Sequence, residues 1–286
     1  ELLLTAFDLG ITHIDAANNY GPPPGAAEEA LGQILKTDLK NHRDELIIAS
    51  KAGYKMWEGP YGDGGSRKYM MASLDQSLRR MGLEYVDIFY HHRPDEETPM
   101  EETMRALADM VRSGKALYVG VSNYSPAQTQ KAQQLLAQEG VPLLIHQHRY
   151  NMLCRQPEEE LYGYLQQAGI GSIAFCPLEQ GLLTGRYVGG IPKDSRALDP
   201  NAVFFSQNDI TPQRLEIVRG LNEVAEQRGQ TLAQMALSWD IRPGACDYVI
   251  IGASRKQQIV ENIECIRKTN FTQQETEAIE HILRAE

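Results

Sequence analysis

Residues 87–139 read DIFYHHRPDEETPMEETMRALADMVRSGKALYVGVSNYSPAQTQKAQQLLAQE. This stretch contains two short apolar runs, Asp87–His92 and Leu117–Ser122, and each run is followed by a longer segment of helical character. The runs predict buried strands, and Met100–Ser113 and Pro126–Glu139 predict the helices that follow them. Strands that alternate with helices across short loops are typical of a parallel sheet.

The same alternation continues on both sides of this stretch. The predicted strands are Thr12–Ala16, Leu46–Ala52, Asp87–His92, Leu117–Ser122, Leu143–Arg149, Gly171–Pro177 and Tyr248–Gly252. The predicted helices are Glu28–Lys36, Arg67–Met81 with Ser66 as its N-cap, Met100–Ser113, Pro126–Glu139, Pro157–Ala168, Pro212–Arg228, Leu232–Trp239 and Lys256–Lys268. Seven evenly spaced strand–helix repeats favour a (β/α)8 TIM barrel over an open doubly wound sheet.

The first residues, Glu1–Phe7, are predicted to be a helix that ends at Gly10. In a barrel this helix would belong to a repeat whose strand is absent, so we expect the first barrel strand to be missing from this chain. A barrel of about 250 residues usually forms one domain. We therefore predict that residues 1–286 form a single barrel domain that is incomplete at its N-terminal side.

The composition excludes several classes of protein. A formal net charge of -10 argues against nucleic acid and anionic membrane as partners. No apolar stretch approaches the roughly 18 residues that span a bilayer. The four cysteines contain no CxxC pair, which argues against a zinc site and against a disulfide framework. We predict a cytoplasmic protein without a metal site.

Four polar residues stand at or just after the carboxyl ends of successive predicted strands, where a barrel carries its functional groups. They are Asp15, Tyr20, Lys51 and His92. A free tyrosine has a pKa near ~10, and an adjacent ammonium lowers that pKa. A carboxylate can hold the lysine, and a neutral imidazole can orient a carbonyl oxygen. Together the four residues predict a general acid for carbonyl reduction.

Each of these residues alone also has a structural interpretation. Tyr20 can be a surface residue, Lys51 can extend its side chain to solvent, and Asp15 can cap a helix. His92 competes with His91, because alternation along a strand sends the two side chains to opposite faces. The combination at successive strand ends, not any single residue, carries the prediction.

The sequence argues against a Rossmann dehydrogenase. The nearest match to GxGxxG, Gly169–Ala174, follows a helix and enters a strand, which reverses the order that the fingerprint requires. Gly252–Arg255, by contrast, precedes a predicted helix whose N–H groups can hold a phosphate, with Arg255 adding charge.

Motifs along nearly the whole chain resemble the aldo-keto reductase family. Gly10–Gly21, GITHIDAANNYG, is similar to the family signature that carries the catalytic Asp and Tyr. Asp87–His92 is similar to the strand that ends in the catalytic His, and its spacing selects His92. The resemblance implies Asp15, Tyr20, Lys51 and His92 as the catalytic set, with NADPH as cofactor.

The resemblance also implies a cofactor site. Val119–Tyr124 and His146-Gln147 resemble the segments that hold the nicotinamide carboxamide. Pro177–Tyr187 resembles the loop over the pyrophosphate, and Ile251–Arg255 resembles the adenosine 2′-phosphate site. The implied cofactor-binding residues are Ser122, Asn123, Gln147, Phe175, Cys176, Pro177, Leu178, Gln180, Arg186, Arg196, Gly252, Ser254, Arg255, Gln258, Glu261 and Asn262. Cys176 replaces a common Ser, so it is either a small buried residue or a redox-sensitive thiol.

Within the family, Asn18–Glu29 and Ala52–Lys68 make the chain most similar to the branch of bacterial L-glyceraldehyde 3-phosphate reductases and potassium-channel beta subunits. The resemblance implies a small aldehyde substrate of the glyceraldehyde 3-phosphate or methylglyoxal type. We expect Trp57 and Tyr61 to close the pocket and Arg67, or a neighbouring basic residue, to hold a substrate phosphate. An ordinary lid with a solvated Arg67 is the alternative.

Two other functions fit parts of the pattern. A Schiff-base aldolase would use Lys51 as its nucleophile, but the Tyr20 signature and the predicted cofactor site argue against it. A cofactor-binding redox sensor or interaction subunit with little turnover would use the same fold and can retain the catalytic residues. The oligomeric state is left open, and a homo-oligomer is compatible with the sequence.

Overall fold

The computed structural model describes residues 1–192, 195–198 and 206–284. The strands are β1 (His13–Asp15), β2 (Ile47–Ala52), β3 (Val86–His91), β4 (Ala116–Ser122), β5 (Leu143–Arg149), β6 (Gly171–Phe175) and β7 (Tyr248–Val249). The α-helices are α1 (Leu2–Asp8), α2 (Ala26–Lys36), α3 (Arg67–Met81), α4 (Met100–Arg112), α5 (Pro126–Gln138), α6 (Leu161–Ala168), α7 (Pro212–Gln227), α8 (Leu232–Asp240), α9 (Lys256–Ile263) and α10 (Gln273–Leu283).

The seven strands follow one another in the sheet in the order of the sequence. The pairings from β1 to β5 are parallel, and Lys51 of β2 lies opposite Tyr90 of β3. Tyr90 in turn lies opposite Gly120 of β4, where an added Cβ would come within 2.6 Å of the Tyr90 ring. This sequential strand order confirms the predicted class of α/β barrel, and the helix predicted at the first residues is present as α1.

The contacts of the chain divide it into two compact units. Unit 1 consists mainly of Leu3–His148 and Gly163–Ile173, and it contains β1 to β5 and the beginning of β6. Unit 2 consists mainly of Arg149–Tyr162 and Ala174–Glu286, and it contains β7 and α7 to α10. The organisation of the chain as a single domain stays a prediction.

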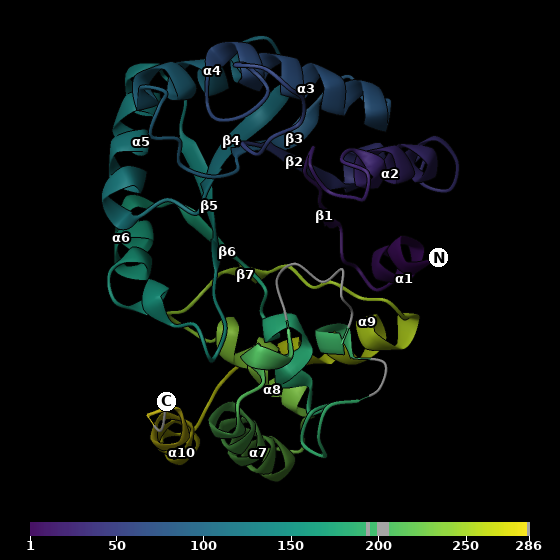
Figure 1. The fold of residues 1–286 in the computed structure, drawn as a ribbon, viewed down its shortest axis with the longest axis vertical. Coiled ribbons are helices and arrows are strands. Elements are labelled where there is room, and N and C mark those ends of the chain that lie inside the picture. The colour runs from purple at the N-terminus through teal and green to yellow at the C-terminus, as the bar shows by residue number, and fades with distance from the viewer. Residues whose placement is uncertain (193–194, 199–205, 285–286) are drawn as a thin grey trace. The chain divides into compact units, whose positions relative to one another are not determined.

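In unit 1, helices α3, α4 and α5 lie along one side of the strands (Figure 1). Helix α4 buries Met104, Leu107 and Met110 on its inner face, as its amphipathic pattern predicts. Helix α3 begins where the sequence predicts, because the Ser66 side chain accepts a hydrogen bond from the Tyr69 backbone. The helices therefore cover the outer side of the sheet.

Unit 2 is built around Trp239, which is fully buried. Apolar residues of α7, α8 and α10, among them Leu221, Met235 and Ile279, share one core with it. Helix α10 is absent from the predicted elements, although Thr272 and Glu275 form a capping box at its start.

Two predicted helices differ from the observed ones by more than two residues. Helix α6 begins at Leu161, because the predicted start at Pro157 is a separate 3-10 turn, Gln156–Glu158. The predicted helix Lys256–Lys268 is divided into α9 and a 3-10 helix, Glu264–Arg267. Among the described residues, no helix is long and apolar enough to cross a membrane, and no disulfide joins the cysteines.

Asp240, at the end of α8, is a carboxyl group without a hydrogen-bond partner in the core of unit 2. It is fully buried, and neither of its side-chain oxygens is hydrogen-bonded. Burial raises the pKa of this carboxyl well above its usual value, and nearby Arg242 offsets only part of that increase, while Glu158 adds to it. Asp240 is therefore protonated in the folded protein over a range of pH in which an unfolded chain would ionise it.

The raised pKa predicts a loss of stability with rising pH. The unfolded chain releases the proton above the ordinary aspartate pKa, and the folded protein does not, so the free energy of unfolding falls by up to about 1.4 kcal/mol per pH unit. Asp240→Asn should remove this slope in urea denaturation between pH 5 and 8. Glu223→Gln, at an exposed position of the same unit, is the control. The same slope in wild type and Asp240→Asn would contradict the assignment.

Candidate active site

A buried ion pair joins the first two strands of unit 1. The Lys51 ammonium donates to the Asp15 carboxylate (Nζ–Oδ2 2.5 Å) and to the carbonyl oxygen of Ala16 (2.7 Å). The Lys51 side chain is 0% exposed and that of Asp15 is 6% exposed. Because β1 and β2 are neighbouring parallel strands, the two residues that the sequence places at successive strand ends lie in direct contact.

Gln147 of β5 occupies the other carboxylate oxygen of Asp15. Its side-chain amide donates to Oδ1 at 3.1 Å, and Gln147 itself is buried. Each oxygen of the buried carboxylate therefore has a donor, which is what a charge removed from water requires. The predicted cofactor-binding amide of Gln147 thus lies beside the ion pair.

Tyr20 and His92 complete the cluster of predicted catalytic residues. The Lys51 ammonium lies 5.0 Å from the centre of the Tyr20 ring. The Tyr20 and His92 rings meet edge to face with their centres 5.9 Å apart. Tyr20 is 37% exposed, whereas Lys51 is fully buried. The phenol therefore lies between a buried ammonium and the surface, where a substrate can reach it.

The two neighbouring histidines lie in different surroundings, as strand alternation predicts. His91 is buried and shares a hydrogen bond with the Tyr124 hydroxyl (2.6 Å), while His92 contacts Tyr20. Burial, with a further contribution from Lys51, lowers the pKa of His92 to about 3. The imidazole of His92 is therefore neutral at physiological pH and can donate a hydrogen bond without adding charge.

Ser122 and Asn123 follow at the end of β4. Asn123 adopts a left-handed conformation with φ 61°. Its side-chain amide donates to the His92 carbonyl oxygen and to the Ser122 hydroxyl, both at 3.0 Å, and its backbone N–H donates to the Gln147 carbonyl oxygen at 3.0 Å. These bonds join the ends of β3, β4 and β5 and hold the predicted carboxamide-binding residues beside the cluster.

The three predicted substrate-binding residues contact three different partners. Trp57 packs on Tyr69, with ring centres 5.1 Å apart, and Tyr61 lies under the Lys68 ammonium at 5.1 Å. Arg67 forms an ion pair with Asp109 of α4. Its guanidinium is thus directed along the helices, and the structure shows no contact between it and the catalytic cluster.

One residue that the sequence analysis did not select, Tyr54, contacts the cluster, and a second, Arg93, contacts Tyr54. The Tyr54 ring meets His92 edge-on with centres 4.7 Å apart, and the Arg93 guanidinium lies 5.1 Å from the Tyr54 ring centre. Arg93 follows His92 directly and Tyr54 follows Lys51 by three residues, so both come just after strand ends. The position of Tyr54 and Arg93 just after strand ends is visible in the sequence, but the direction of their side chains cannot be derived from it.

In unit 2, the predicted pyrophosphate loop follows Phe175 at the end of β6. Cys176, Glu179 and Gln180 have positive φ angles of 57°, 43° and 54°, which non-glycine residues seldom adopt. The Gln180 side-chain amide donates to the Cys176 sulfur at 3.4 Å. Burial raises the pKa of the Cys176 thiol, which disfavours the reactive thiolate. Pro177 is buried.

The buried carboxylate of Glu179 anchors this loop. It accepts hydrogen bonds from Arg149 (2.5 Å) and from Asn151 (2.7 Å). Leu178 packs against the core of unit 2. These contacts hold a backbone conformation that would otherwise be unfavourable. Arg186 is exposed, and the side chain of Arg196 lies outside the described part of the chain.

The predicted adenosine-phosphate residues surround the start of α9. The Gln258 side-chain oxygen accepts from the backbone N–H groups of Ser254 (2.8 Å) and Arg255 (3.1 Å). An added Cβ at Gly252 would meet nothing within 4 Å. Glu261 accepts from Gln257, and Asn262 is buried. Exposed Arg255 thus stands at a helix N-terminus, a position that favours anions.

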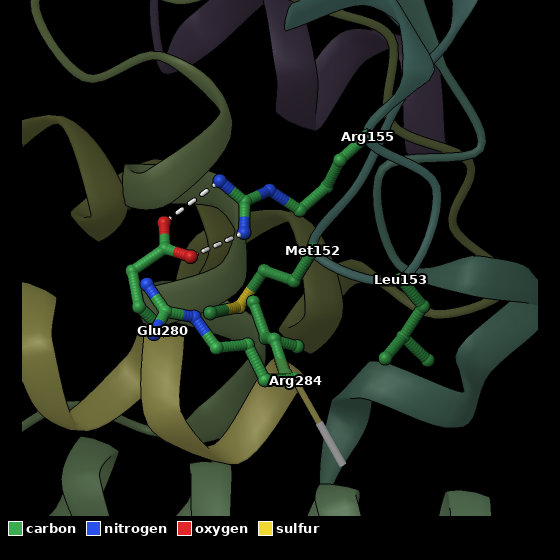
Figure 2. A pocket seen from close by; sticks show the side chains of 6 residues that line it. Met152, Leu153, Arg155, Glu280 and Arg284 are labelled. Atoms are coloured by element: carbon green, nitrogen blue, oxygen red, sulfur yellow. Dashed lines mark hydrogen bonds and ion pairs between the residues drawn. The ribbon is translucent and has the colours of Figure 1, made fainter. Parts of the chain in front are cut away.

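A separate pocket of about 140 Å³ in unit 2 is shown in Figure 2. Its lining residues are Met152, Leu153, Arg155, Glu280, Leu283 and Arg284. Arg155 forms two hydrogen bonds with Glu280, at 2.8 and 2.7 Å. None of the predicted site residues lines this pocket. Within the described residues there is also no group of three His, Cys, Asp or Glu side chains that could hold a metal ion.

Comparisons with known proteins identify the family of this chain. A model of the Aldo/keto reductase family matches residues 1–284. An L-glyceraldehyde 3-phosphate reductase of Escherichia coli (strain K12) is 57% identical, and the alignment covers 100% of this chain and 84% of that protein. A "Probable voltage-gated potassium channel subunit beta" of Arabidopsis thaliana is 36% identical, covering 93% and 81%. A crystal structure of a thermostable aldo-keto reductase with the inhibitor epalrestat matches with a TM-score of 0.75 and 27% identity, covering 98% and 85%.

The buried ion pair predicts a large cost for removing one partner. Asp15→Asn leaves the Lys51 ammonium buried without its counter-charge, so the free energy of unfolding should fall by roughly 3–5 kcal/mol. Asp75→Asn is the matched control, because the Lys115–Asp75 pair is 40% and 39% exposed and should contribute at most about 1 kcal/mol. Urea denaturation measures both. Similar small losses in the two variants would show that Lys51 is not held as a buried charge.

Proposed function

The chain belongs to the aldo/keto reductase family and is an aldehyde-reducing oxidoreductase, and from this premise we propose that it uses NADPH to reduce a small phosphorylated aldehyde. The observation that carries the proposal is the position of the Lys51 ammonium. It contacts the Asp15 carboxylate on one side and lies 5.0 Å from the Tyr20 ring on the other, with His92 beside Tyr20.

Tyr20 is the proposed proton donor to the carbonyl oxygen. The Lys51 ammonium stabilises the phenolate that remains after proton transfer, and Asp15 holds Lys51 in place. Neutral His92 donates a hydrogen bond to the carbonyl oxygen and positions it. NADPH, when bound, supplies the hydride that reaches the carbonyl carbon. Hydride and proton together convert the aldehyde to a primary alcohol.

The chain carries a donor set that fits NADPH. The Ser122 hydroxyl and the amides of Asn123 and Gln147 supply donors and acceptors that suit the nicotinamide carboxamide, beside the catalytic cluster of unit 1. In unit 2, Phe175 supplies an aromatic face. The remaining proposed cofactor-binding residues are Cys176, Pro177, Leu178, Gln180, Arg186, Arg196, Gly252, Ser254, Arg255, Gln258, Glu261 and Asn262. Their arginines offer charge to the phosphates, and Arg255 stands at a helix N-terminus.

The substrate class follows from the relatives. The 57% identity to a protein named L-glyceraldehyde 3-phosphate reductase supports glyceraldehyde 3-phosphate, and methylglyoxal is the unphosphorylated alternative. The potassium channel beta subunits at 35–36% identity favour a second candidate, a cofactor-binding sensor or interaction subunit with little turnover. Steady-state oxidation of NADPH with an aldehyde panel separates the enzyme from the sensor. The aldolase fits less well, because the Lys51 nitrogen is already engaged by two acceptors, the Asp15 carboxylate and the Ala16 carbonyl oxygen.

Tyr20→Phe tests the proton donor. The variant keeps the ring and loses the hydroxyl, so kcat should fall by roughly 10²- to 10⁴-fold, the usual contribution of general acid catalysis. The dissociation constant of NADPH, measured by fluorescence titration, should stay nearly unchanged. A variant that retains more than about a tenth of the wild-type kcat would contradict the role of Tyr20.

Arg255→Ala tests the choice of cofactor. Charge-assisted hydrogen bonds to the 2′-phosphate contribute about 1.5–3 kcal/mol, so affinity for NADPH should fall roughly 10- to 150-fold. Affinity for NADH should change little, because NADH lacks that phosphate. Arg267→Ala removes an exposed arginine of the same unit and is the control. Equal losses of NADPH and NADH affinity would assign Arg255 a different role.

A further inference from the structure

Arg93 follows His92 directly and lies at the edge of the catalytic cluster. Its guanidinium carbon is 5.1 Å from the centre of the Tyr54 ring, and that ring meets His92 edge-on at 4.7 Å. Together with the contacts of Lys51, Tyr20 and His92, these contacts form one continuous row. Arg93 is therefore one aromatic ring away from the imidazole that is proposed to hold the substrate carbonyl.

The Arg93 guanidinium is held in place along one edge. Its Nε donates to the Gly53 carbonyl oxygen at 2.8 Å, and Nη2 donates to the Asp63 carboxylate at 2.9 Å. Nη1 donates to none of the residues that the structure describes. The side chain is 35% exposed. A guanidinium that is fixed and stacked in this way keeps N–H donors for an incoming anion and loses little side-chain entropy when it binds one.

The other cations near this loop have partners away from the cluster. Arg67 is paired with Asp109 of α4. Lys55 is paired with Glu58 at 2.8 Å, and both side chains are mostly exposed. Lys68 lies over the Tyr61 ring. Arg93, in contrast, lies over the ring that contacts His92, so of these cations it is the one linked to the cluster by a single aromatic ring.

We propose that Arg93, stacked on Tyr54, binds the anionic group of the substrate, a phosphate carried a few bonds from the reacting aldehyde. The proposal rests on the proposed function and specifies its substrate class. The carbonyl lies between Tyr20 and His92, Tyr54 forms the wall beside it, and the phosphate lies against the Nη1 edge of Arg93. This assigns to Arg93 the role that the sequence alone suggested for Arg67 or a neighbouring basic residue.

The phosphate either displaces Asp63 from the Arg93 guanidinium or binds the guanidinium together with Asp63. The Arg93–Asp63 pair is 35% and 46% exposed, so it is held weakly. A phosphate of higher charge can form the stronger bidentate contact with the guanidinium. Asp63 also accepts from the Gly64 backbone N–H, which keeps its carboxylate in the loop after the exchange.

The first test compares two substrates in the complete enzyme. Arg93→Ala should lower kcat/KM for L-glyceraldehyde 3-phosphate roughly 10- to 100-fold more than kcat/KM for L-glyceraldehyde. Arg93→Lys should restore part of the preference, because it returns the charge without the planar donor edge. Asp63→Asn should raise the preference about two- to fivefold. The control is Arg105→Ala, which removes a cation that is 66% exposed and paired with Glu139.

The second test needs no turnover. Calorimetric titration measures binding of glycerol 3-phosphate, with glycerol as the uncharged probe, to wild type and to Arg93→Ala. Loss of glycerol 3-phosphate binding in the variant, with normal binding in Arg105→Ala, supports the site. Equal binding in wild type and variant, or equal kinetic losses on the two aldehydes, would overturn it. If wild type reduces neither aldehyde, the proposed function fails, while the titration still decides the role of Arg93.

Discussion

The buried pair of Lys51 and Asp15 is the interaction on which the rest of the site depends. An ammonium that is 0% exposed is expensive to remove from water, and it is tolerated only if a counter-charge and hydrogen-bond acceptors surround it. Asp15 and the Ala16 carbonyl supply these. Asp15 in turn needs the Gln147 amide at its second oxygen. A single buried charge therefore links β1, β2 and β5 and restricts how these strands can be aligned.

The same charge explains why its neighbours are aromatic or neutral. A second cation beside Lys51 would be repelled, and burial together with Lys51 lowers the pKa of His92 to about 3, which keeps that ring neutral. The ring faces of Tyr20 and Tyr90 lie 5.0 and 5.7 Å from the ammonium and stabilise it through their electron-rich centres. Of these groups, partly exposed Tyr20 combines contact with the ammonium and access from solvent. The buried charge of Lys51 thus restricts which groups can lie beside it and favours their neutral forms.

The sequence predicts what depends on periodicity and strand order, and it predicts less well what depends on side-chain direction. Strand alternation separates His91 from His92 correctly, and Ser66 caps α3 as expected. The role expected for Arg67 rests on its place in the chain near the mouth of the site. In the structure its guanidinium forms an ion pair with Asp109 of α4, and the expected role stays a prediction. Tyr54 and Arg93 were missed because their contacts beside His92 come from two different loops, which spacing along one strand cannot show. Helix α10 was missed although its capping box at Thr272 and Glu275 was present in the sequence.

The chain has a net charge of -10, which disfavours binding of an anionic, phosphorylated substrate. This effect is limited by the distance over which exposed charges act. At physiological ionic strength, exposed charges are screened beyond about 8 Å, so the charge within a few contacts of the bound group decides whether an anion is held there. Around His92 the near charges are Lys51 and Arg93, with Asp15 neutralising the first and Asp63 only weakly pairing the second. The exposed Arg93–Asp63 pair is the weaker of the two, so a phosphate can compete with Asp63 for the Arg93 guanidinium although the chain as a whole is acidic.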